Sequence, residues 1–138
     1  MKNVVKTLGI AAGLFAVVTV SAQQRDFGSD PSTCQRNLSL YDTDFKMNNY
    51  DAAIVYWRKI WRDCPLASIN LTLQGAQMYK YYIDRELNAD RKNALVDTLM
   101  QVWEKGIALR PQAAVNYRIG MMQDMLKYND TPEISQKF

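Results

Sequence analysis

Apolar positions follow a helical period of three and four residues along most of this chain, from about residue 32 onward. In the stretch 50–63, for example, Ala53, Trp57 and Ile60 recur at the spacing that places side chains on one face of a helix. Polar and turn-forming residues interrupt this period at several points. We find no alternating strand pattern and no Asn-Gly hairpin signal, so an all-α fold is expected. The predicted helices cover residues 32–47, 50–63, 68–87, 91–105 and 112–128.

Particular residues are expected to begin and end these helices. Ser32, followed three positions later by Gln35, fits a capping box for the first helix. Asp90 is expected to cap the helix over 91–105. Gly106 and Pro111 are expected to bound an irregular turn after that helix.

The first 22 residues have a different pattern and are typical of a cleavable signal peptide. Lys2 and Lys6 precede an uncharged apolar run, and a small-residue cleavage site ends at Ala22. The run is shorter than the roughly 20 apolar residues that a membrane-spanning helix needs. We therefore expect cleavage after Ala22, export to the periplasm or beyond the cell, and no transmembrane segment in the mature chain. The expected organisation is a signal peptide over 1–22, a flexible entry segment over 23–31, a helical domain over 32–128 and a frayed tail over 129–138.

Cys34 and Cys64 are the only two cysteines, and they bracket the first pair of predicted helices. A short break at 48–49 would fold the two helices, each about 20 Å long, back on each other. The start of the first helix would then lie beside the end of the second. Export to an oxidising compartment then favours one disulfide between them. Two buried free thiols are the alternative.

Charge and composition exclude several classes of function. Loss of Lys2 and Lys6 with the signal peptide reduces the 17 basic residues to 15, which 14 acidic residues nearly balance, for a net charge of +1. Nucleic-acid binding usually needs a basic face, so no nucleic-acid partner is expected. The chain has no histidine, which excludes a Ser-His-Asp triad, a Cys-His pair and a His-ligated zinc site. We expect no catalytic residue, no metal and no cofactor.

Two groups of side chains have both a structural and a functional interpretation. Trp57, Trp61 and Trp103 could line a ligand cleft, but their helical spacing favours a place in the core. Asp42 and Asp44 could form an acid–base pair, yet two positions on a helix point about 200° apart. Solvation or capping is the preferred interpretation for these carboxylates.

Tyrosine and methionine clusters leave similar alternatives open. Tyr79, Tyr81 and Tyr82 cannot all face one side of a helix, so at least one is expected at a surface or groove edge. The methionines of the last two helices could suggest soft-metal capture, but packing is preferred over a copper site. These residues are Met100, Met121, Met122 and Met125.

The second predicted helix carries the pattern of a known repeat family. Ala53, Trp57 and Pro65 lie at spacings 0, +4 and +12, and Tyr50 precedes Ala53 by three. The next unit matches less closely, because its register slips by seven or eight residues. The chain resembles a divergent tetratricopeptide-repeat protein, of the exported type found in envelopes of Gram-negative bacteria. Its opening CQRNLSLYDTDFKMNNYDAAIVYWRKIWRDCP and the later KNALVDTLMQVWEKGI carry this resemblance.

The resemblance implies stacked antiparallel helical hairpins that bind protein or peptide on a concave face formed by the first helix of each pair. We therefore predict a non-catalytic envelope adaptor or scaffold. The alternatives are a carbohydrate-binding accessory factor or enzyme subunit, with the tyrosine cluster as its contact surface, or a self-assembling structural subunit. The residues placed on the concave face are Asp42, Phe45, Lys46, Ala76, Tyr79 and Lys80.

The last predicted helix is unusual because apolar residues occupy much of its circumference. Arg118 and Asp124 are expected to contribute to a polar outer face, as the terminal helix of a stack requires. Even so, the apolar arc is wide enough to leave an exposed patch. We expect that patch to meet another protein or a second copy of the chain, which predicts a homo-oligomer through this helix. Four apolar residues repeat the helical period there, namely Val115, Ile119, Met122 and Leu126.

Overall fold

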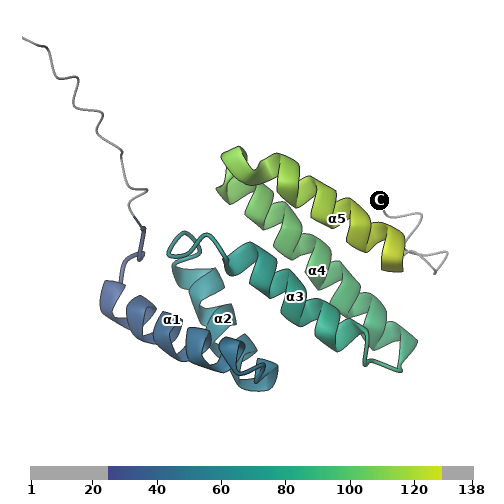
Figure 1. Ribbon diagram of the computed structural model, residues 1–138, viewed down its shortest axis with the longest axis horizontal. Coiled ribbons are helices and arrows are strands. Elements are labelled where there is room, and N and C mark those ends of the chain that lie inside the picture. The colour runs from purple at the N-terminus through teal and green to yellow at the C-terminus, as the bar shows by residue number, and fades with distance from the viewer. Residues whose placement is uncertain (1–24, 129–138) are drawn as a thin grey trace, which may run out of the picture.

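The computed structural model describes residues 25–128, and the regular secondary structure of this part of the chain is helical, without a strand (Figure 1). The all-α prediction is therefore confirmed. The predicted signal peptide and the predicted C-terminal tail lie outside the described residues. The helices are α1 (Pro31–Lys46), α2 (Tyr50–Asp63), α3 (Leu71–Ile83), α4 (Ala89–Leu109), the short 3-10 helix η1 (Pro111–Ala113) and α5 (Ala114–Tyr128).

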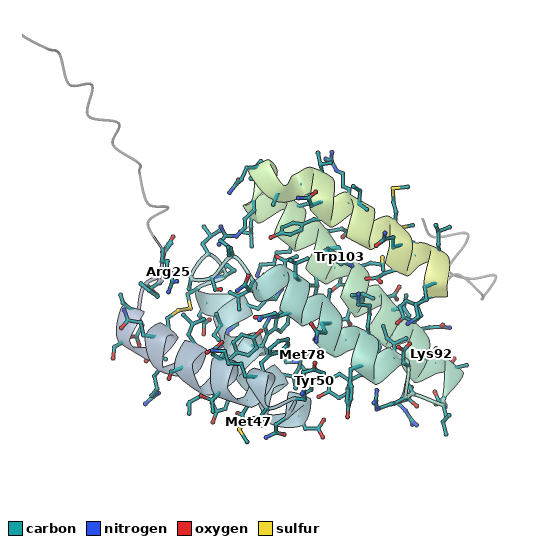
Figure 2. The ribbon with its side chains drawn as sticks, viewed as in Figure 1. Arg25, Met47, Tyr50, Met78, Lys92 and Trp103 are labelled. Atoms are coloured by element: carbon teal, nitrogen blue, oxygen red, sulfur yellow. A yellow bond between two sulfur atoms is a disulfide. The ribbon has the colours of Figure 1, made fainter. Side chains whose placement is uncertain are left out.

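Helices α1 and α2 form a disulfide-closed hairpin. Asn48 makes the tight turn between them with a positive φ of 57°, a conformation that asparagine tolerates better than most residues. Cys34 and Cys64 are bonded, with their Cα atoms 6.4 Å apart. The S–S bond is visible in Figure 2 where α1 begins beside the end of α2. The predicted disulfide and the antiparallel hairpin it requires are both confirmed.

Helices α3, α4 and α5 pack on one another in sequence, with α5 at the outer edge of the molecule (Figure 1).

Glycines allow two close helix contacts, one between α2 and α3 and one between α4 and α5. A Cβ atom at Gly75 would lie 2.2 Å from Cζ2 of Trp57, and one at Gly120 would lie 2.6 Å from Cη2 of Trp103. Each tryptophan of these pairs thus fills the space that a larger residue on the facing helix would need.

The start of α1 differs from the prediction. Asp30 is the N-cap, and its Oδ1 accepts a hydrogen bond from the Thr33 amide at 3.0 Å. The predicted capping box of Ser32 and Gln35 is wrong, because Pro31 begins the helix instead of preceding it. Proline suits the first helical position for two reasons. Its fixed φ is already helical, and the N–H that it lacks would have no intrahelical acceptor at this position.

Helices α3 and α4 also differ from the prediction at their ends. Helix α3 is shorter than 68–87, and Asn88, not Asp90, caps α4 by accepting a hydrogen bond from the Arg91 amide. Helix α4 does not end at Gly106 but continues to Leu109. The reason is tertiary: a Cβ atom at Gly106 would lie 2.3 Å from Cγ2 of Thr72, so this glycine serves helix packing and not helix termination.

The described part of the entry segment lies against the first hairpin. Phe27 packs on the core, and Gly28, with φ of 70°, approaches Asp63 so closely that a Cβ atom would be 2.5 Å from its carbonyl oxygen. Residues 25–30 thus cover one end of α2. Across residues 25–128, the helices lack the combination of length and apolar character that crossing a membrane requires.

Candidate functional site

The predicted binding residues of α1 are already engaged with one another and with the core. Lys46 forms an exposed ion pair with Asp42 one turn earlier. Phe45 is partly buried, and its ring centroid lies 5.7 Å from that of Tyr41 and 5.4 Å from that of Tyr50. Asp42 thus balances the charge of Lys46, and Phe45 belongs to an aromatic cluster.

The predicted binding residues of α3 lie mostly inside the molecule. Ala76 and Tyr79 are 1% and 4% exposed, and the Tyr79 ring packs against Trp57. Lys80 reaches α5, where its Nζ lies 3.4 Å from Oδ1 of Asp124. The structure thus brings Lys46 and Lys80 each to a carboxylate of its own, and it does not assemble the six predicted residues into one open surface.

The tyrosine cluster of α3 divides between core and groove edge. Tyr79 is buried, whereas Tyr81 and Tyr82 are partly buried. The Tyr82 hydroxyl donates to Oδ1 of Asp51 at 2.8 Å. Partial burial, together with this bond to a carboxylate, raises the pKa of Tyr82.

A groove lies between α2 and α4, with α3 as its floor. It consists of two hollows of about 340 and about 480 Å³ that share Arg58 as a lining residue. Sizes of this order are common for binding sites. We call the two hollows together the α2–α4 groove. Its lining includes Arg58, Trp61, Tyr82, Arg85, Gln101 and Lys105.

Three cations of the α2–α4 groove have no acidic partner. Within residues 25–128, no carboxylate lies within salt-bridge distance of Arg58, Arg85 or Lys105. Arg58 Nε donates a long bond of 3.4 Å to the Tyr79 hydroxyl, and Arg85 lies 3.6 Å over the Tyr81 ring. These neutral contacts position the cations without balancing their charge.

Lys105 is the most buried of the three cations. Its Nζ donates to the backbone carbonyl of Trp61 at 2.6 Å and lies 4.9 Å from the centroid of the Trp61 ring. Burial lowers the pKa of Lys105, because a charged amine is less stable out of water. A carboxylate that entered the groove would reverse this effect.

The acidic side chains near the groove already have hydrogen-bond or ion-pair partners within the chain. Asp51 accepts the Tyr82 hydroxyl, and Glu86 pairs with Arg91 across the turn before α4. Asp63 accepts hydrogen bonds from both Nε and Nη2 of Arg62. Asp51 keeps its negative charge because its partner is a neutral hydroxyl, so three unpaired cations against one unpaired carboxylate leave the groove with a net positive charge.

Sequence reasoning missed this groove, although part of its signal was present. Thr98, Gln101 and Lys105 form a polar stripe at spacings of three and four on α4, and the structure turns this stripe toward α2. A polar stripe of this kind is normally assigned to solvent. Which helix faces it depends on contacts between residues distant in sequence, and these leave no local pattern.

The four apolar residues predicted on the last helix point away from the molecule. Val115, Ile119, Met122 and Leu126 are 68%, 51%, 61% and 77% exposed. The buried residues of α5 are instead Tyr117, Asp124 and Tyr128. The expectation that Asp124 lies on the outer face is wrong, because its Oδ2 accepts the Nε1–H of Trp103 at 2.9 Å inside the α4–α5 contact.

No protein-family model, no curated protein and no solved structure matches this chain. The resemblance to tetratricopeptide repeats therefore stays a prediction. In the described residues, no group of three or more Cys, Asp or Glu side chains could hold a metal ion.

Proposed function

We propose that this protein is an exported, non-catalytic helical adaptor that holds an acidic segment of another protein in the α2–α4 groove. One observation carries the proposal: three cations line a groove with an aromatic floor and have no carboxylate partner among residues 25–128. A mature net charge close to zero makes this local excess notable. The groove thus holds three cations that contact neutral oxygens and an aromatic ring but pair with no carboxylate of residues 25–128.

The groove has the chemistry that an acidic segment needs. Side-chain carboxylates of the partner would bond to Arg58 and Lys105, whose present partners are neutral oxygens. Charge-assisted bonds of this type are stronger than bonds between neutral groups. Trp61 and Tyr82 are partly buried beside them and offer contact area for apolar side chains between the acids. The two hollows adjoin at Arg58 and are open, so one segment of a partner would lie across both.

Two features support the exported location and the adaptor class. The disulfide between Cys34 and Cys64 suits an oxidising compartment, and the sequence of residues 1–22 has the pattern of a signal peptide. Successive packing of helical hairpins is the architecture that the resemblance to tetratricopeptide repeats implies. These observations favour a periplasmic or extracellular binding protein.

The groove favours binding over catalysis. An enzyme that acts by acid–base chemistry would need a polar group free to exchange a proton with its substrate. The nearby carboxylates, Asp51 and Glu86, each have a bonded partner, and the Lys105 amine donates to the Trp61 carbonyl. A carbohydrate-binding accessory factor would use the same aromatic floor, but it would not need the unpaired cations.

The test compares peptide binding by groove and control variants of the disulfide-bonded mature chain. The probe is a fluorescent peptide of alternating Glu and Phe residues, with a Lys-Phe peptide as its charge-reversed control. We expect Arg58→Gln with Lys105→Gln to weaken binding of the Glu-Phe peptide by about tenfold or more, the effect of about 1.4 kcal/mol of lost ion pairing. Fluorescence anisotropy at about 50 and about 300 mM salt measures this change and its screening.

A matched control removes the same charge elsewhere. Arg36 and Lys92 are exposed and lie outside the groove, so Arg36→Gln with Lys92→Gln should retain wild-type affinity within about twofold. Equal weakening of peptide binding in both double variants would show that binding depends on overall charge and not on the groove. Absence of binding by the wild type, or equal binding of both peptides, would overturn the proposal.

A further inference from the structure

A further polar hollow lies at the loop between α2 and α3. It has a volume of about 320 Å³, and residues 66–70 of that loop form most of its lining. Arg25, labelled in Figure 2, and Arg110 at the end of α4 complete the lining. We call this site the loop hollow. It shares no lining residue with the α2–α4 groove.

Arg110 is a buried cation without a carboxylate partner. It is 9% exposed, and its guanidinium donates from Nη2 to the Leu66 carbonyl at 3.1 Å. No acidic side chain of residues 25–128 lies within salt-bridge distance of it. A buried charge is costly unless an opposite charge compensates it, and one neutral carbonyl does not. The charge of Arg110 is therefore the feature of the loop hollow that indicates an anionic ligand.

Arg25 adds a second unpaired cation to the lining. It is exposed, and within the described part of the chain it has no carboxylate at salt-bridge distance. Arg25 also borders an adjoining hollow that contains Asp42, but that carboxylate already pairs with Lys46. The loop hollow itself has no acidic lining residue. Two guanidinium groups thus line a hollow without a negative charge.

The loop that forms the hollow is held in place by other parts of the fold. Arg110 bonds to the Leu66 carbonyl, and Tyr117 on α5 donates its hydroxyl to the Ile69 carbonyl at 3.4 Å. These two carbonyl oxygens would repel an anion, and both already accept hydrogen bonds. The lining is therefore fixed by contacts that do not involve a ligand.

Two neutral side chains of the lining can donate hydrogen bonds. Ser68 Oγ accepts the Asn70 amide N–H at 3.3 Å, which leaves the hydroxyl hydrogen of Ser68 free to donate. Asn70 is the N-cap of α3 and makes no side-chain capping bond, so its carboxamide can donate as well. The positive end of the α3 dipole adds to this field. The loop hollow thus combines positive charge with neutral donors.

We propose that the loop hollow binds a tetrahedral oxyanion, a phosphate or sulfate group, between Arg25 and Arg110. One guanidinium fork can bond to two oxygens at once. Two forks and the Ser68 hydroxyl therefore serve more oxygens than the two of a carboxylate. The paired positive charges also match a dianion better than they match a single carboxylate.

The size of the loop hollow favours an ester over a bare anion. A volume of about 320 Å³ corresponds to about ten water molecules, which is more than a bare phosphate fills. Ile69 is 59% exposed and belongs to the lining, so it offers apolar contact area for the group that carries the phosphate or sulfate. We therefore expect a phosphate or sulfate ester of a small organic group as the preferred ligand.

Calorimetric titration of the disulfide-bonded mature chain tests the proposal. The probes are phenyl phosphate, phenyl sulfate, inorganic phosphate and acetate, each in chloride buffer. We expect Arg25→Gln to weaken phenyl phosphate binding by about fivefold or more, since a charge-assisted contact is lost. Arg36→Gln is the matched control: it removes an exposed arginine outside the loop hollow, so affinity should stay within about twofold of the wild type.

Arg110 is tested in the wild-type protein, because its substitution would also break the bond to Leu66. In a nitrogen–proton NMR titration, the Nε–H signals of Arg25 and Arg110 should shift with phenyl phosphate, and that of Arg36 should not. A shift confined to Arg25 would assign the binding to one exposed charge and would overturn the site. Absence of binding by the wild type would overturn it as well.

The four probes identify the chemistry of the ligand. Tighter binding of the phenyl esters than of inorganic phosphate supports an ester, and comparison of the two esters separates phosphate from sulfate. Tighter binding of inorganic phosphate would support the oxyanion site but would overturn the expected ester. Acetate binding as tight as that of phosphate would overturn the preference for a tetrahedral anion.

This inference goes beyond the proposed groove function, because a separate set of residues carries it. Arg58→Gln with Lys105→Gln should bind phenyl phosphate as the wild type does. Arg25→Gln should likewise bind the Glu-Phe peptide as the wild type does. The loop hollow and the α2–α4 groove can therefore fail separately.

Discussion

Trp57 connects the two halves of the described fold. It is 1% exposed, and its Nε1–H donates to the Leu71 carbonyl at the start of α3 at 2.9 Å. Its ring stacks on Trp61 at 5.1 Å and occupies the space left by Gly75. The sequence pattern correctly predicted a core role for this tryptophan. It could not predict the bond to Leu71 or the contact with Gly75, because both partners lie on another helix.

Polar residues were harder to place than apolar ones. Asp124 was predicted on the outer face of α5, yet it is 5% exposed and bonded to Trp103. An aspartate in a helical stripe is normally solvated, and here the indole N–H of Trp103 and the ammonium of Lys80 together make its burial favourable. Lys46 and Lys80 were both predicted on the concave binding face, but each pairs with a separate carboxylate.

At the residue scale, we predict that Asp30 stabilises α1 and that Ser32 does not. The hydrogen bond from the Thr33 amide lowers the pKa of Asp30. A carboxylate with a lowered pKa adds stability above its unfolded pKa, near 4, and this stability is lost as the pH falls through the folded pKa. Asp30→Ala should therefore melt below the wild type at pH 7, and the two melting temperatures should converge as the pH falls to about 2. Thermal denaturation followed by circular dichroism measures both effects.

Ser32→Ala is the control for this cap. Ser32 is exposed and lies inside α1, so its removal should leave the melting temperature nearly unchanged at either pH. A larger loss for Ser32→Ala than for Asp30→Ala would restore the capping box that the sequence suggested.

At the scale of elements, local pattern predicted which segments are helical but not where each helix ends. Helix α2 was predicted over its full extent, because its wide apolar stripe and the flanking Asn49 and Pro65 agree with each other. Helix α4 runs past Gly106, because packing against Thr72 outweighs the usual preference of glycine for a helix end. Helix ends therefore depended on tertiary contacts, which a single sequence does not reveal.

The contact between α2 and α3 gives a prediction at this scale. Gly75→Ala places a methyl group where Cζ2 of Trp57 would be 2.2 Å away. The indole cannot yield easily, because it is bonded to Leu71 and stacked on Trp61. We expect a loss of about 1–3 kcal/mol in the free energy of unfolding, which is typical of overpacking. Urea denaturation measures it.

The sign of the change and a double variant separate this effect from helix propensity. Alanine is the better helix former by about 1 kcal/mol, so a gain in stability for Gly75→Ala would show that the α2–α3 contact adjusts freely. A combined Gly75→Ala and Trp57→Phe variant should lose less than the sum of the two single changes, because the smaller ring makes room for the methyl group.

At the scale of the whole molecule, the hairpins are held together by a few long-range bonds as well as by Trp57. Lys105 on α4 bonds to the carbonyl of Trp61, and the buried Arg110 bonds to the carbonyl of Leu66 at 3.1 Å. These bonds join residues 44 positions apart in sequence. They connect α4 to the end of the first hairpin, so the two hairpins should not unfold independently.

The disulfide tests this cooperativity. Cys34 and Cys64 close a segment of 30 residues within the first hairpin, and a crosslink of that length removes about 3–4 kcal/mol of freedom from the unfolded chain in the entropic model. Cys34→Ala with Cys64→Ala should lower the free energy of unfolding by this amount relative to the oxidised protein, and the reduced wild type should match the double variant. Because Trp57 and Lys105 still join the hairpins, the reduced protein should unfold in one transition, with far-UV circular dichroism and tryptophan fluorescence coinciding. Two separate transitions would instead show that the crosslink, and not the contact between α2 and α3, holds the first hairpin to the rest.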